Sequence, residues 1–147
     1  MEEQKLPTLA LRSLALELHV PCFERVLEFY RLLGFQEAWR EEQYLVLKSG
    51  IDLIAFYGGS PSVVKHSYFS HFPSDTKRGY GVEVIVFVDD LFATLASLPD
   101  STPVLAPIQL RPWGHRDFRI EDPFGYYLRV SERYDLSRAT QNRATER

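Results

Sequence analysis

The feature that most constrains this fold is an internal repeat. One strand pattern, one amphipathic helix pattern and three more strand patterns occur twice, about 70 residues apart. The length of the chain suits one domain or two tightly fused small modules, and the repeat predicts two such modules. We expect the first module at about 12–57, a linker at 58–80 and the second module at about 81–132. Together they predict one domain over 1–136, followed by a polar tail at 137–147.

Hydrophobic periodicity predicts the elements of each module. Alternating apolar residues predict strands, and apolar residues spaced three and four apart predict helices. In the first module these patterns predict a strand at 14–20, a helix at 22–33 and strands at 35–40, 43–48 and 51–57. In the second they predict a strand at 82–88, an Asp-capped helix at 89–97 and strands at 104–110, 117–121 and 126–132.

The segment 113–131 predicts a tight β-hairpin. Asp122-Pro123-Phe124-Gly125 has the residues of a turn, because Pro123 presets φ and Gly125 accepts a left-handed conformation. Apolar residues alternate on both sides of the turn, and the residues between them are too polar for a solvent-free core. We therefore expect this second face to line a cleft; it consists of Asp117, Arg119, Glu121, Tyr127, Arg129 and Ser131.

Composition and charge exclude several classes of protein. The chain has 147 residues with a net charge of −3, which is unlike a nucleic-acid-binding domain. Its apolar runs are too short to span a membrane, and Met1–Lys5 lacks the pattern of a signal peptide. Cys22 is the one cysteine, so no intrachain disulfide can form. We expect a cytoplasmic protein that binds neither nucleic acid nor membrane.

Three motifs give the chain a family resemblance: Glu28-Phe29-Tyr30-x-x-Leu33-Gly34-Phe35, Trp113-Gly114-x-Arg116-x-Phe118 and Asp122-Pro123-x-Gly125-Tyr126. With them the chain resembles the vicinal oxygen chelate superfamily, which includes glyoxalases, extradiol dioxygenases and bleomycin-resistance proteins. The pattern is most similar to the bleomycin-resistance-like branch. The resemblance implies an α+β fold of tandem βαβββ modules that form a curved, open, mixed sheet around a cleft. It also implies a homodimer.

The enzymes of this superfamily hold a divalent metal in the cleft. Counting from the motifs places the four ligand positions at Ala15, Ile54, Glu83 and Arg129. Only Glu83 can bind a cation, since a guanidinium has no lone pair to donate. We therefore predict that no metal or other cofactor binds, and that Glu83 and Arg129 neutralise each other.

Alternation places Glu17 and His19 on the cleft face of the first strand. There they would contact a ligand, or else be satisfied by neighbouring strands. The long linker could add the rings of Tyr68, Phe69 and Phe72, and its His66 and His71 are expected to be solvated. Trp113 could stack against a planar ligand. The predicted cleft set is Glu17, His19, Ile54, Phe56, Glu83, Phe87, Trp113, Tyr127 and Arg129.

Three hypotheses of function follow. The first is a metal-free protein of the bleomycin-resistance type that sequesters a small molecule, such as an antibiotic, in a cleft at a dimer interface, with no catalytic residues. The second is a lyase, isomerase or dioxygenase that depends on a divalent metal such as Zn, Ni, Mn or Fe, with His19 and Glu83 as ligands. The third is an interaction domain without a small ligand. We favour the first, which is not an enzyme.

Overall fold

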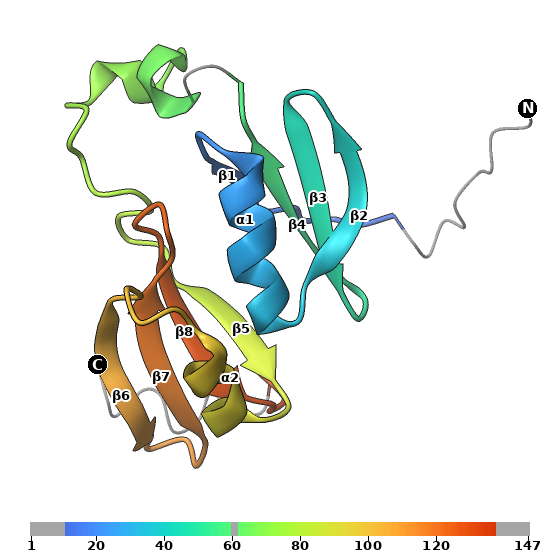
Figure 1. Cartoon of the computed structure of the whole chain (residues 1–147), viewed down its shortest axis with the longest axis vertical. Helices are drawn as coiled ribbons and strands as arrows, with labels where there is room; N and C mark the ends of the chain where they lie inside the picture. Colours follow the sequence, from blue (N-terminus) through green and yellow to red (C-terminus); the bar gives the residue numbers. More distant parts are fainter. Residues whose placement is uncertain (1–10, 60–61, 138–147) are drawn as a thin grey trace, which may run out of the picture.

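The computed structural model describes residues 11–59 and 62–137. It contains two four-stranded sheets, each with one α-helix on one face (Figure 1). This confirms the predicted α+β fold of tandem βαβββ modules. All but the first residue of the predicted polar tail, 137–147, lies outside the described residues.

The first module forms a mixed sheet in the order β1-β4-β3-β2, in which β1 runs parallel to β4 and the other pairs are antiparallel. Helix α1 continues into the 3-10 turn η2 and ends at Gly34, whose φ of 94° is the left-handed conformation that glycine tolerates. The elements are β1 Glu17–His19, α1 Phe23–Tyr30, η2 Arg31–Leu33, β2 Gln36–Glu41, β3 Tyr44–Ser49 and β4 Asp52–Tyr57.

The second module repeats this order as β5-β8-β7-β6, again with its first strand parallel to its last. Asp90 caps helix α2, as the sequence predicts, because its Oδ1 accepts the N–H of Ala93 at 3.0 Å. The connection between the modules carries two 3-10 turns. The elements are η3 Ser62–Lys65, η4 Phe69–His71, β5 Val84–Val88, α2 Leu91–Ser97, β6 Val104–Leu110, β7 Arg116–Glu121 and β8 Tyr127–Glu132.

Strand β1 is shorter than the predicted strand at 14–20. It pairs only with β4, from Glu17 opposite Ala55 to His19 opposite Tyr57. Of the described residues before Leu16, which begin at Leu11, none pairs with a strand, and Leu14 is 85% exposed. The predicted start of this strand at residue 14 is therefore wrong, since alternation alone does not show where a partner strand ends.

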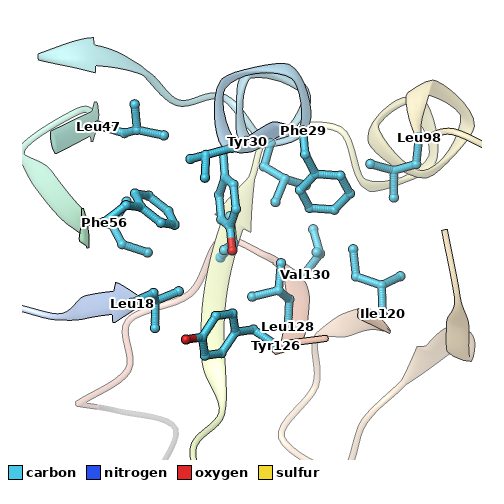
Figure 2. Packing of buried hydrophobic residues seen from close by; sticks show 14 of the residues in the cluster. Leu18, Phe29, Tyr30, Leu47, Phe56, Leu98, Ile120, Tyr126, Leu128 and Val130 are labelled. Carbon is cyan, nitrogen blue, oxygen red and sulfur yellow. The ribbon is translucent and has the colours of Figure 1, made fainter. Parts of the chain in front are cut away.

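A single hydrophobic core joins the two modules. Side chains of α1 lie between the first sheet and strand β8, and they pack with residues from both modules (Figure 2). Tyr30 spans this junction, because its hydroxyl donates to Asp122 Oδ2 at 2.7 Å while its ring packs on Phe56. Tyr126 makes a second link by donating from its hydroxyl to the carbonyl of His19 at 2.8 Å. The modules are therefore held together by buried contacts and not only by the linker.

The predicted hairpin turn is confirmed. Asp122 Oδ1 accepts the backbone N–H groups of Phe124 and Tyr126, and Gly125 has a φ of 92°. The same carboxylate thus shapes the turn and, through Oδ2, anchors α1 of the other module.

Candidate functional site

Each sheet has a core face that packs on the helices and an outer face on the opposite side. Strand register assigns the residues to these faces, since side chains alternate along a strand. In the first sheet Glu17 and His19 lie opposite Ala55 and Tyr57, so these four share the outer face. Ile54 and Phe56 alternate with them and are buried in the core. The prediction that Ile54 and Phe56 line the same cleft as His19 is therefore wrong, because their side chains lie on the opposite face of the sheet.

His19 is the centre of a cluster on the first outer face. Its Nε2 lies 3.3 Å from Glu17 Oε2, and its ring makes edge contacts with Tyr57, His66 and Phe69. The linker therefore does place an aromatic ring over this face, as the sequence suggests for Phe69. His66 is not simply solvated, because its Nδ1 accepts the N–H groups of Tyr68 and Phe69 and so orders the linker. We call Glu17, His19, Tyr44, Tyr57, His66 and Phe69 the His19 cluster.

Burial and hydrogen bonding shift two pKa values in the His19 cluster. Burial lowers the pKa of His19, and the nearby Glu17 carboxylate opposes this only in part. A hydrogen bond to the Glu17 carboxylate raises the pKa of Tyr44 to about 12. Glu17 thus lies close to both His19 and Tyr44. The cluster is a preformed polar site on a sheet face, and alternation alone found two of its members.

The second outer face is a buried polar layer. The sequence prediction that these residues are too polar for a core fails for Asp117, Arg129 and Ser131, which are almost completely buried. They are covered because the five-residue connection between β6 and β7 folds back over the sheet. From that connection Arg111 Nε donates to Asp117 Oδ1 at 2.9 Å, and the Trp113 ring lies under Arg129.

The predicted Glu83–Arg129 pair is confirmed. Arg129 Nε lies 3.4 Å from Glu83 Oε1, and the Arg129 guanidinium sits 5.2 Å from the centre of the Trp113 ring. Phe87 shares this face, as predicted, and its ring contacts Tyr134. The carboxylate of Glu83 is one-third exposed, whereas the side chain of Arg129 is only 4% exposed.

A hollow of about 400 Å³ opens beside this layer. Glu83 and Tyr127 line one side of it, and the Lys77–Val82 segment of the linker lines the other. Lys77 forms an ion pair with Glu121, and Arg78 donates to the carbonyl of His19 at 2.9 Å. The hollow therefore connects the second outer face to the linker.

The predicted cleft residues thus fall into three places. Glu17 and His19 lie on the first outer face, Ile54 and Phe56 lie in the core, and the rest lie on or beside the second outer face; these last are Glu83, Phe87, Trp113, Tyr127 and Arg129.

The residues present do not fit a divalent metal ion. Glu83 is engaged by Arg129, and no hydrogen bond or ion pair joins it to His19, the other candidate ligand. In the described residues no three His, Cys, Asp or Glu side chains are grouped as a metal site requires. We therefore derive no chemical step through a metal.

Sequence patterns missed several residues of both outer faces. Tyr44 and Tyr57 could have been found if β1 had been paired with β4, and β4 with β3, before each residue was assigned to a face of its strand. Arg111 carries no such signal, because it reaches Asp117 from a connection whose path the sequence does not reveal.

Comparison with known proteins identifies the superfamily to which the chain belongs. The family model described as Glyoxalase/Bleomycin resistance protein/Dioxygenase superfamily matches residues 13–130, and the chain belongs to this superfamily. A search of curated proteins found no match. Among the described residues, no helix has the length and hydropathy to cross a membrane.

Solved structures show the same fold at low identity. A protein of unknown function from Agrobacterium tumefaciens is 21% identical with a TM-score of 0.67, over 84% of this chain and 95% of that one. A bleomycin resistance determinant encoded on transposon Tn5 is 17% identical with a TM-score of 0.55, over 85% and 100% of the two chains. A bleomycin-binding protein complexed with bleomycin is 19% identical with a TM-score of 0.53, over 84% and 100%.

Proposed function

We propose that this protein binds and sequesters a small molecule, without converting it, in clefts between two copies of the chain. The observation that carries the proposal is that both outer faces hold half-buried aromatic and ionisable side chains that their own chain does not fully cover. His19 and its neighbours form one such surface, and Tyr127, Glu83 and the adjoining hollow form the other. Superfamily membership and the fold shared with bleomycin-resistance proteins support this reading.

A homodimer is part of the proposal. The outer face of the first sheet leaves Trp39 and Leu53 52% and 46% exposed, and the edge strand β2 is exposed along its whole length. Exposed edges and apolar faces of this kind favour association. A second copy would cover them and place its own outer face across the cleft.

Binding without chemistry follows from the fit of the residues. The second outer face holds Arg129 where the resemblance places a metal ligand, and Glu83 is paired with that arginine. The site therefore offers ring stacking, hydrogen bonds and charge, which suffice for recognition. Resistance to an antibiotic by sequestration is proposed on the same grounds. A cytoplasmic location is proposed from the sequence composition alone.

A ligand screen tests this function. Thermal shift against a panel of drug-sized molecules, including bleomycin, should give at least one compound whose binding saturates at one per chain by calorimetry. Mass spectrometry should recover that compound unchanged. Tyr127→Ala should weaken binding, whereas Phe92→Ala should not, because the exposed Phe92 lies on α2 across the sheet. Conversion of the ligand, or the absence of any binder, would contradict the proposal.

A further inference from the structure

We propose that the ligand of this site carries an oxyanion, a carboxylate or a phosphate, which binds between Arg119 and Arg129 on the second outer face. The inference rests on the proposed binding function and names the chemical class of its ligand. Two arginines of this face, Arg119 and Arg129, each have a buried Nε that makes no hydrogen bond.

Arg129 is a buried cation without a hydrogen bond. Its side chain is 4% exposed, and its nearest acceptor is Glu83 Oε1, 3.4 Å from Nε. No hydrogen bond joins its guanidinium to any other described residue, and Nε is fully buried. Because buried donors are nearly always satisfied, the unbonded Nε gives Arg129 a hydrogen-bonding capacity that its ion pair with Glu83 leaves unused.

Arg119 has the same deficiency. Its Nε is buried and makes no hydrogen bond, and its closest acceptor, Asp117 Oδ1, is 3.7 Å away. That oxygen already accepts from Arg111 Nε at 2.9 Å. Arg119 therefore interacts only weakly with the Asp117 carboxylate, which Arg111 already engages. Its side chain is 26% exposed, so a solute can reach it.

Arg119 and Arg129 occupy opposite positions on neighbouring strands. Arg119 is directly opposite Arg129 in the antiparallel pairing of β7 and β8, and both side chains are on the outer face. Like charges in directly opposite positions of a sheet repel each other. An anion placed between them would remove the repulsion and accept hydrogen bonds from both. Guanidinium groups bind carboxylates and phosphates in this way, often through two parallel hydrogen bonds.

The charge balance of the layer also favours an anion. Three guanidinium groups, those of Arg111, Arg119 and Arg129, face two carboxylates, Asp117 and Glu83. The adjoining hollow adds Lys77 and Arg78, of which only Lys77 is neutralised by a carboxylate, that of Glu121. The layer and hollow therefore carry an excess of positive charge.

The hollow gives the rest of the ligand a place. Tyr127 lines it and lies on the same face as Arg129, two residues before it on β8. Glu83 touches both the hollow and Arg129. A ligand whose anionic group reaches Arg119 and Arg129 can therefore extend its body over Tyr127. A planar, aromatic acid matches this arrangement, since a tyrosine ring provides a surface for stacking.

Isothermal titration calorimetry with matched probes tests the proposal, in a buffer free of phosphate and sulfate. Benzoate and benzamide have the same shape but differ in charge, and phenyl phosphate supplies the alternative oxyanion. We expect at least one anionic probe to bind the full-length wild-type protein about tenfold or more tightly than benzamide. The tighter of the two anions shows whether the site prefers carboxylate or phosphate.

Arg119→Gln is the informative variant, because Arg119 is accessible and makes no hydrogen bond that the fold would lose. It should reduce the affinity for the anionic probe about tenfold and leave benzamide unchanged. Arg40→Gln is the matched control, since Arg40 forms an exposed ion pair with Glu24 in the other module and should not affect binding.

Equal affinity for benzoate, phenyl phosphate and benzamide would overturn the oxyanion site. So would weaker self-association of Arg119→Gln without binding of any probe, because the missing partner would then be a carboxylate of a second copy. If panel compounds bind the wild type and Arg119→Gln with the same affinity, the oxyanion site fails while the proposed function stands. If anions bind but a bound ligand is converted, the proposed function fails while the oxyanion site stands.

Discussion

The first module leaves most of its outer face open, whereas the second module buries the centre of its own. Both have the same strand order and the same parallel pairing of first and last strands. Between β2 and β3 the chain turns in two residues, but between β6 and β7 it has five, 111–115. The longer connection carries Arg111 and Trp113 over the sheet and buries a charged layer. Duplication therefore sets the topology, and connection length sets the chemistry of each face.

Both modules, by contrast, contribute buried side chains to the one hydrophobic core. Leu47 of the first sheet and Leu128 of the second are both buried in one cluster (Figure 2). Leu47→Ala and Leu128→Ala should each lower the free energy of unfolding by about 2–5 kcal/mol, because each leaves a cavity in that cluster. Urea denaturation followed by circular dichroism should show one transition in both. Leu53→Ala, on the exposed outer face, should change little. Two separate transitions would show that the modules fold independently.

The junction between the modules is expected to give the next largest effect. Tyr30→Phe removes the hydroxyl that donates to Asp122 and leaves a buried carboxylate oxygen without that partner. We expect a loss of about 1–3 kcal/mol in urea denaturation. Tyr80→Phe is the control, since Tyr80 is 89% exposed. An unchanged midpoint in Tyr30→Phe would mean that this bond does not hold the modules together.

The two modules should also respond to pH with opposite sign. Burial lowers the pKa of His19 below its ordinary 6.5, so the folded state favours neutral imidazole. This contribution to stability is present above pH 6.5 and is lost as the pH falls through the folded pKa. Burial instead raises the pKa of Asp122, whose contribution is present below its ordinary 3.8 and is lost as the pH rises.

Melting temperatures between pH 5 and 8 test the His19 part of this contrast. The decrease in melting temperature on acidification should be smaller in His19→Phe than in the wild type. In His71→Gln, whose residue 71 is exposed, the decrease should equal that of the wild type. Equal pH profiles for wild type and His19→Phe would remove His19 as the cause.

The smallest effect is expected at the helix starts. Asp90 caps α2, whereas Cys22 has the extended backbone of an N-cap residue before α1 but no capping hydrogen bond. Asp90→Ala should cost about 1 kcal/mol, and Cys22→Ser should add a few tenths, since serine can accept the free N–H groups of the first turn. Denaturation midpoints that move in the same direction in both variants would contradict this difference.

Sequence patterns predicted the elements well because burial of one face imposes periodicity. Helix α1, strand β6 and the turn at Asp122 lie where the pattern places them. The Glu83–Arg129 pair was also predictable, since two opposite charges on neighbouring strands of one face have few other partners.

The chemistry of the outer faces was less predictable. Ile54 and Phe56 were assigned to the wrong face because counting from a motif ignores which strand pairs with which. Asp117 was expected to line a cleft but is completely buried, because its cover comes from a connection without periodicity. Sequence patterns therefore give the face of a strand only when its pairing is known, and they do not give the path of a loop.

Native mass spectrometry of the full-length protein with its best-binding panel compound would test the central claim most directly. The claim is that the outer faces of two copies form clefts that hold an unmodified small molecule. It predicts a dimer that carries one unchanged ligand per chain. A single chain that binds the compound with full affinity, or a dimer that binds none, would contradict it.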